Sequence, residues 1–223
     1  MRAKNPRPTA KTRATASARP TARARSVAAN RTASVDRSTR ETRVRVKLNL
    51  DGTGERKIRT GIGYFDHMLE QLAFHGLLDL ELSCEGDLQV DSHHTVEDVG
   101  LALGKAIDEA LGERTGIRRY GHAYLPMDET LVRVVLDFSG RPEFHFQGAF
   151  TRDRIGELET QMVPHFFKSV ALAARMTLHM DVLRGENDHH KAEALFKGLA
   201  RALSDSIVLE PRRVGVSSTK GKL

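Results

Sequence analysis

His93-His94-Thr95-Val96-Glu97 and His189-His190-Lys191-Ala192-Glu193 share one pattern, His-His-x-x-Glu, which occurs once in each half of the 223-residue chain. Each stretch opens a run of apolar residues with helical spacing, so each is expected at the start of a helix. In a helix, Glu97 lies one turn after His93, and both side chains then share one face. Two imidazoles and a carboxylate on one turn form a ligand set for a divalent transition metal. The two copies of the pattern indicate an internal duplication.

The residues around the two motifs also repeat. Apolar and polar residues alternate over 43–50, which is typical of a half-buried strand. A histidine stands on the helix expected before each motif, His67 in the first half and His165 in the second. The expected helices cover residues 64–75, 93–111, 158–174 and a run that begins at 189, and the expected strands of the second half cover 122–127, 131–138, 143–148 and 176–182.

Turn residues at 51–54 and 85–87 predict two hairpins in the first half, with return strands near 55–60 and 88–91. Sheets that carry helices on one face are the natural architecture for this order of elements. We therefore predict an α+β fold, an internally duplicated two-layer α/β sandwich with helices on one face of each sheet. The first repeat is expected at residues 35–118 and the second, with a C-terminal tail, at 119–223.

Residues 1–34 differ in composition from the rest of the chain. They contain nine Lys and Arg residues and no Asp or Glu, so the net charge of +6 comes from this segment. The remainder gives no reason to expect nucleic acid as a partner. Because large apolar side chains are almost missing from 1–34, we expect a disordered basic extension. A dispensable extension, an organelle-targeting peptide, as in a plastid form, and a polyanion-binding arm remain alternatives.

The composition also bounds the location of the protein. No run of eighteen apolar residues occurs, so no membrane span is expected. The single cysteine, Cys84, excludes an internal disulfide and fits a reducing compartment. Its position in an alternating strand pattern favours a packing role over a reactive one. The cytoplasm is the expected location.

Six imidazoles and two carboxylates are candidate metal ligands, enough to give two ions three His and one Glu each. The absence of thiolates argues against a closed structural zinc site, and mixed His/Glu ligation suits Mn, Fe, Co, Ni or Zn. The sequence does not show which histidine joins which ion. The candidate ligands are His67, His93, His94, Glu97, His165, His189, His190 and Glu193.

Basic and hydroxyl residues form a second candidate group. Arg119 follows the first repeat, Arg141 ends an expected strand, and Lys197 lies one helical turn after Glu193. The chain ends with Ser217-Ser218-Thr219-Lys220-Gly221, whose hydroxyl, backbone N–H and ammonium groups are suited to a phosphate. A small-molecule phosphate is therefore the expected partner.

Residues 36–223 resemble the imidazoleglycerol-phosphate dehydratase family of histidine biosynthesis, in its monofunctional form. The resemblance implies a fold like the second domain of ribosomal protein S5, two Mn²⁺ ions per active site, and a 24-subunit homo-oligomer with active sites between subunits. The resemblance also implies that all eight candidate residues are metal ligands. It associates seven further positions with the substrate: Glu41, Gln71, Arg119, Arg141, Lys197, Ser218 and Lys220. The matching stretches are 61–69, 91–98, 116–121, 136–142, 187–197 and 218–221.

The resemblance implies dehydration of imidazole-glycerol phosphate to imidazole-acetol phosphate. Ligation of the ring nitrogens by Mn²⁺ would favour a metal-bound imidazolate, which expels the adjacent hydroxyl and gives a diazafulvene-like intermediate. A carboxylate then removes the neighbouring proton. Glu193 and Glu97 are the candidates for this base, and Glu41 is expected to position the substrate hydroxyls.

Two other classes of protein use similar residues. A hydrolytic two-metal enzyme also contains His/Glu clusters, but it needs ions about 3.5–4 Å apart with water between them. A non-catalytic metal-storage or metal-sensing cage would give the basic residues no role. A nucleic-acid-binding role would depend on residues 1–34 alone.

Overall fold

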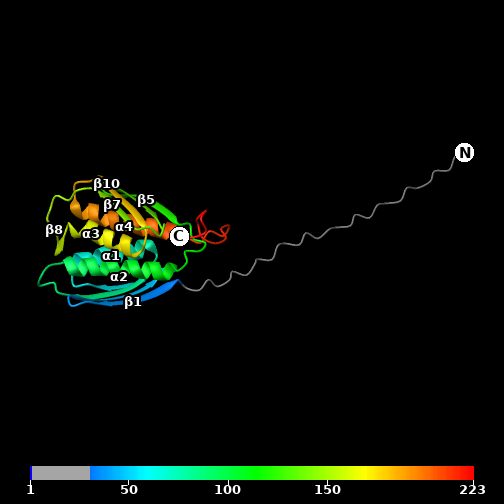
Figure 1. The fold of residues 1–223 in the computed structure, drawn as a ribbon. Helices are drawn as coiled ribbons and strands as arrows, with labels where there is room; N and C mark the ends of the chain where they lie inside the picture. Colours follow the sequence, from blue (N-terminus) through cyan, green and yellow to red (C-terminus); the bar gives the residue numbers. More distant parts are fainter. Residues whose placement is uncertain (2–30) are drawn as a thin grey trace.

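The computed structural model describes Met1 and residues 31–223, and in this part of the chain two four-stranded sheets enclose four helices (Figure 1). The first half contains β1 (Thr32–Ser38), β2 (Thr42–Asn49), β3 (Arg56–Arg59), α1 (Gly63–Gly76), β4 (Asp79–Gly86) and α2 (His93–Leu111). The second half contains β5 (Tyr120–Met127), β6 (Thr130–Asp137), β7 (Glu143–Gln147), β8 (Arg154–Ile155), β9 (Leu158–Glu159), α3 (Met162–Ala173), β10 (Thr177–Arg184) and α4 (Asp188–Ser206).

The two halves have the same topology. Their sheets have the orders β1-β2-β4-β3 and β5-β6-β10-β7. In each sheet the third and fourth strands of the order pair in parallel, and the other neighbours are antiparallel. The internal duplication predicted from the two motifs is therefore confirmed. Only the short β8–β9 hairpin has no counterpart in the first half of the described chain.

The helices fill the space between the sheets. α1 and α2 cover the inner face of the first sheet, α3 and α4 cover that of the second, and the helix layers pack with α1 on α4 and α2 on α3 (Figure 1). Aromatic rings join the layers: Phe166 contacts Phe65 and Phe196, each at a centroid distance of 5.2 Å. The predicted sandwich, with helices on one face of each sheet, is confirmed.

All four helices begin at the same end of the molecule. Tyr64 lies beside His189 at the first turns of α1 and α4, and the carbonyl of His75 accepts a hydrogen bond from Arg201 near their last turns. His93 and His165 likewise adjoin at the first turns of α2 and α3. Side chains early in each helix therefore meet at one end of the helical layers.

Several local predictions for the first half were wrong. β3 forms within the expected range, but it pairs in parallel with β4 and makes no hairpin with β2. The connection is held by Asp79, whose Oδ1 accepts the backbone N–H groups of Thr53 and Glu55. Residues 88–91 form no strand, because the chain turns directly into α2. The turn residues alone did not indicate which strands of the sheet would pair with each other.

Two predicted boundaries, the end of the N-terminal extension and the start of α3, also differ from the structure. Residues 32–34 fall in the segment predicted to be disordered, but they belong to β1, which pairs with β2 and buries Val35. The rest of that prediction concerns residues 2–30, which lie outside the described residues. α3 begins at Met162, four residues later than expected, because 154–159 form the β8–β9 hairpin.

Two further features concern the helices and the single cysteine. Among residues 31–223, no helix combines the length and the apolar character needed to cross a membrane. Cys84 is a buried free thiol on β4, and burial raises its pKa to about 11. A thiol with a raised pKa is a poor nucleophile, which agrees with the packing role expected for this residue.

Candidate active site

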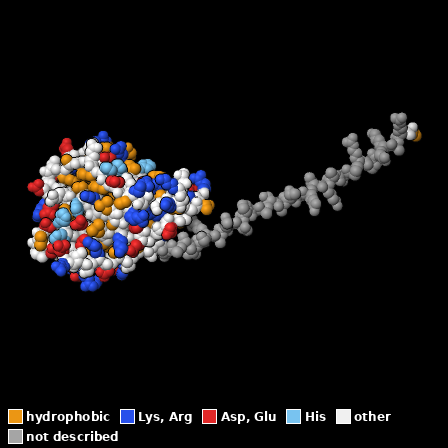
Figure 2. Space-filling model, viewed as in Figure 1, with side chains coloured by type: hydrophobic (Ala, Val, Ile, Leu, Met, Phe, Trp, Pro, Cys, Tyr) orange, Lys and Arg blue, Asp and Glu red, His pale blue; other side chains and the backbone are white. Residues whose placement is uncertain are grey.

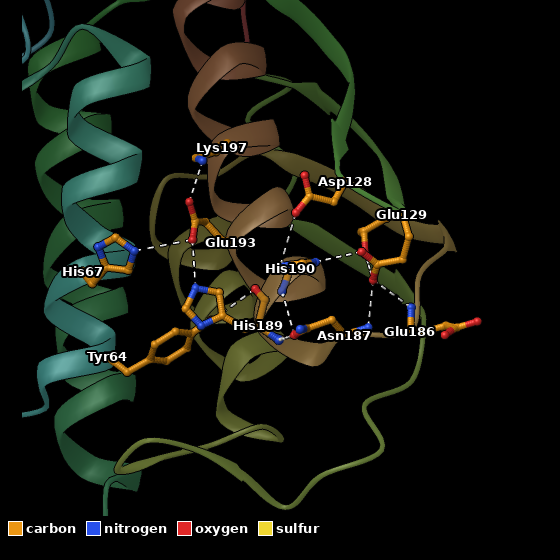
Figure 3. Close-up of polar contacts among 11 residues, drawn as sticks. Tyr64, His67, Asp128, Glu129, Glu186, Asn187, His189, His190, Glu193 and Lys197 are labelled. Carbon is orange, nitrogen blue, oxygen red and sulfur yellow. Dashed lines mark hydrogen bonds and ion pairs between the residues drawn. The ribbon is translucent and has the colours of Figure 1, made fainter.

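One candidate metal cluster lies between α1 and α4 (Figure 3). It contains His67 from α1 and His189 and Glu193 from α4. Oε2 of Glu193 is 3.1 Å from Nε2 of His189 and 3.4 Å from Nε2 of His67. We call these three residues the α1–α4 cluster. The helical spacing of four places His189 and Glu193 on one face, and the packing of α1 adds the third ligand.

A second cluster lies between α2 and α3 and contains His93, Glu97 and His165. Glu97 is 3.9 Å from His93 Nε2 and 3.5 Å from His165 Nε2, measured from its two carboxylate oxygens. The Nε2 atom of His165 is buried and makes no hydrogen bond to any described residue. A buried polar atom without a partner is costly, and a metal ion would satisfy it. These residues, the α2–α3 cluster, fit a divalent ion.

The two clusters pair residues across the halves of the chain. His67 from the first half joins the second motif, and His165 from the second half joins the first motif. This crossing follows from the packing of α1 on α4 and of α2 on α3. The structure therefore groups one candidate histidine from each half with the motif of the other half. His94 and His190, the other two candidate ligands, lie outside both clusters.

His94 and His190 each contact a carboxylate through Nδ1. Asp87, just after β4, is 3.0 Å from His94 Nδ1, and its hydrogen bond raises the pKa of this imidazole. Glu129, in the turn between β5 and β6, is 2.7 Å from His190 Nδ1. The backbone N–H of Asn187 and the His190 ring hold the pKa of Glu129 far below its usual value. Neither carboxylate was predicted, because single acidic residues in turns carry no sequence pattern.

The start of α4 is fixed by three further residues. Oδ1 of Asn187 caps the helix by accepting the backbone N–H groups of His189 and His190. Behind them, Lys191 Nζ donates to Asp188 Oδ1 at 2.8 Å, and both side chains are almost fully buried. Burial opposes ionisation of Asp188, but the bonds from Lys191 and from the backbone of 151–152 bring its pKa to about 2. These contacts therefore hold the first turn of α4, where the second motif begins, in place.

The two cluster carboxylates differ in their surroundings. Lys197 Nζ lies 2.5 Å from Oε1 of Glu193, whose side chain is only 8% exposed. Burial raises the pKa of Glu193, but the hydrogen bond and charge of Lys197 outweigh it, and the pKa falls below its usual value. Glu97 is 40% exposed, and Leu101 occupies the position one turn later. Glu97 therefore has the freer carboxylate.

Two predicted substrate residues lie near these histidines. Gln71 Nε2 is 3.5 Å from Nδ1 of His67, at the edge of the α1–α4 cluster. Glu41, in the turn between β1 and β2, has Oε1 3.8 Å from His94 Nε2. With Lys197, three of the seven predicted substrate residues therefore lie near the candidate metal clusters.

The other four predicted substrate residues line a separate pocket of about 620 Å³ formed by the C-terminal segment. Figure 2 shows Lys and Arg side chains gathered at this end of the molecule. Its lining includes Arg119, Arg141, Ser218 and Lys220, together with Arg213 and Lys222, which the sequence did not single out. Asp137 forms a bidentate ion pair with Arg119 and holds it in place. Several cations beside hydroxyl groups make this basic pocket suited to a phosphate.

The basic pocket and the metal clusters lie at opposite ends of the helices. The backbone N–H of Arg119 donates to the carbonyl of Ser206, the last residue of α4, whereas His189 belongs to the first turn. A helix of 19 residues is about 28 Å long. The length of α4 therefore separates the basic pocket from the α1–α4 cluster of the same chain.

Comparison with known proteins supports the resemblance inferred from the motifs. Residues 60–203 match the sequence model of imidazoleglycerol-phosphate dehydratase. Proteins of that name from Paracidovorax citrulli (strain AAC00-1) and Aminomonas aminovorus are 56% and 55% identical over 188 residues, which cover 84% of this chain and 90% and 96% of theirs.

Solved structures agree with the sequence comparison. The dehydratase from Staphylococcus aureus subsp. aureus N315 has a TM-score of 0.73 and 36% identity, over 80% of this chain and 99% of that chain. The enzyme from Pyrococcus furiosus has a TM-score of 0.73 and 35% identity, over 85% and 100%. By sequence and by fold, the chain belongs to the imidazoleglycerol-phosphate dehydratase family, the hydro-lyases of histidine biosynthesis.

Proposed function

We propose that the chain converts imidazole-glycerol phosphate to imidazole-acetol phosphate with two Mn²⁺ ions per active site. The main support for metal dependence is the pair of His/Glu clusters. In one of them, Nε2 of His165 is buried and makes no hydrogen bond to a described residue. When bound, Mn²⁺ would act as a Lewis acid on the imidazole ring of the substrate and lower its N–H pKa. The residues that would hold the ions are the six cluster residues, with His94 and His190 as further ligands.

We also propose a homo-oligomer, the 24-mer implied by the resemblance, with active sites between subunits. The separation of the basic pocket from the metal clusters supports this, because one substrate needs both a phosphate site and a ring site. His94 and His190 support it as well. A carboxylate holds each imidazole in place, and neither imidazole belongs to a cluster of its own chain. A neighbouring copy would complete each metal site and supply the phosphate contacts.

Within such a site, different residues of the chain would bind the phosphate, bind the hydroxyls and take the proton. Arg141, Ser218 and Lys220 would hold the phosphate, and Gln71 and Glu41 the substrate hydroxyls. Glu97 is the better candidate for the base, because its carboxylate is more exposed and is not paired with a lysine, as that of Glu193 is. It would take the C–H proton after the hydroxyl has left, and the resulting enol becomes the ketone. One water is lost in total.

The alternative functions gain less support. The two clusters share no residue, so no described side chain bridges two ions as in many hydrolytic two-metal sites. A storage or sensing cage leaves the basic pocket without a role. The polyanion-binding role concerns a segment outside the described residues. The cytoplasmic location remains a proposal, supported by the single buried cysteine.

Activity on the expected substrate should depend on the metal. The purified chain, loaded with Mn²⁺ and given imidazole-glycerol phosphate, is expected to form the ketone product. Turnover is expected to stop on chelation and return when Mn²⁺ is added. Bound metal without turnover would contradict the proposal and favour a hydrolase or a storage protein.

Lys220→Met is expected to raise KM by about 10- to 100-fold, because a charge-assisted hydrogen bond contributes roughly 1.5–3 kcal/mol. Lys220 is exposed at the rim of the basic pocket, so its loss should not affect folding. Lys105→Met, which removes the same charge from the surface of α2, is the control. Steady-state kinetics of the three proteins test this prediction, and equal KM values would remove Lys220 from the phosphate site.

A further inference from the structure

Glu129 connects the turn between β5 and β6 to the first turn of α4 (Figure 3). Its Oε2 lies 2.7 Å from Nδ1 of His190. Its Oε1 accepts the backbone N–H groups of Asn187 at 2.8 Å and Glu186 at 3.1 Å. Each carboxylate oxygen therefore has its own partners, and the side chain cannot rotate without breaking these bonds.

These contacts determine the proton position on His190. An ionised carboxylate only accepts hydrogen bonds, so Nδ1 of His190 must donate and carry the proton. In the neutral ring, Nε2 then has a free lone pair. The nearest described carboxylate to Nε2 is Asp128, at 3.6 Å, and its side chain is 78% exposed. In this tautomer Nε2 is the nitrogen that can bind a metal.

We propose that Glu129 is a positioning residue: it fixes His190 in the Nδ1–H tautomer and holds Nε2 ready to ligate a metal ion outside the α1–α4 cluster. This inference rests on the proposed metal dependence. It assigns a role to a residue that neither the motifs nor the substrate contacts indicated. Carboxylates that orient a ligating imidazole through its other nitrogen affect metal affinity by about 10- to 100-fold.

Asp87 makes the corresponding contact to His94, but its anchoring is different. Both of its carboxylate oxygens lie near Nδ1 of His94, at 3.2 and 3.0 Å. Among the described residues, no backbone N–H donates to the Asp87 side chain. An amide at position 87 can therefore rotate, whereas an amide at position 129 is held by two backbone donors.

This difference in anchoring can be tested by comparing the amide variants Glu129→Gln and Asp87→Asn. In Glu129→Gln the amide oxygen must face the two backbone N–H groups, so the NH₂ group faces Nδ1 of His190. Nδ1 must then accept, and the ring proton moves to Nε2, which can no longer ligate. We expect the Mn²⁺ affinity to fall by about 10- to 100-fold. In Asp87→Asn the oxygen can turn to His94, so the tautomer persists and the loss stays well below that range.

The tautomers are measured in the metal-free full chain by ¹⁵N NMR of labelled histidine, with His190→Gln and His94→Gln identifying the two rings. Mn²⁺ affinity is measured separately by titration. Glu186→Gln is the control, because it removes the same charge from the neighbouring loop between β10 and α4, and its side chain points away from His190 (Figure 3). It is expected to change neither readout.

The outcomes separate this inference from the proposed function. A wild-type Nδ1–H tautomer that inverts in Glu129→Gln, together with weaker Mn²⁺ binding, supports the role of Glu129. An Nε2–H tautomer in the wild type, or an unchanged tautomer and affinity in Glu129→Gln, overturns this role and leaves the proposed function intact. A wild-type chain that binds no Mn²⁺ overturns the proposed function and this inference together.

Discussion

Glu97→Gln is expected to lower kcat by roughly two to four orders of magnitude at saturating Mn²⁺, the range for loss of a general base. Glutamine keeps the size of the side chain and a carbonyl oxygen, but it cannot take a proton from carbon. The carboxylate of Glu97 is 40% exposed, and its closest contacts are His93 and His165. The measurement is kcat over a Mn²⁺ titration, with the metal content determined at each point.

Glu193→Gln is the matched comparison, because Glu193 occupies the same position in the second motif. Its Oε1 lies 2.5 Å from Lys197 and its Oε2 lies 3.1 Å from His189, so it is held more closely than Glu97, whose histidine contacts are 3.5 and 3.9 Å. This variant is expected to bind Mn²⁺ more weakly and to regain kcat as Mn²⁺ is raised. A normal kcat in Glu97→Gln, with a loss in Glu193→Gln that metal does not reverse, would assign the base to Glu193.

Lys191→Met is expected to destabilise the fold by about 3–5 kcal/mol, because it leaves the carboxylate of Asp188 buried without its cation. The side chains of Lys191 and Asp188 are 5% and 1% exposed. The double variant Asp188→Asn/Lys191→Met removes both charges and is expected to recover part of the loss. Denaturant unfolding of the metal-free proteins measures these differences. A single variant as stable as the wild type would contradict this account of the buried pair.

The same pair predicts a dependence of stability on pH. The pKa of Asp188 is lowered from 3.8 to about 2 in the folded chain. A depressed carboxylate pKa contributes stability that is fully present above the unfolded value and is lost as pH falls through the folded value. Between about pH 4 and pH 2 the wild type should therefore lose stability that the double variant does not lose. Parallel pH profiles of the two proteins would show that Asp188 contributes nothing in this range.

Much of the secondary structure was predictable because it depends on local periodicity. The helix at 93–111 and the strands near 122–127 and 131–138 follow from spacings of 3.6 and 2 residues within short windows. Strand pairing was not predictable in the same way. The segment near 55–60 forms a strand as expected, but it pairs in parallel with β4, a partner more than twenty residues away. Local turn chemistry gives no information on such distant partners.

The sequence by itself determined the duplication and placed His93 beside Glu97 and His189 beside Glu193, because residues four apart share one face of a helix. Tertiary structure decided how these residues combine. His67 joins Glu193, and His165 joins Glu97, because α1 packs on α4 and α2 on α3. It also separated the basic pocket from the clusters by the length of α4 and placed Glu129 beside His190. These relations arise from packing between elements distant in sequence, so no local pattern encodes them.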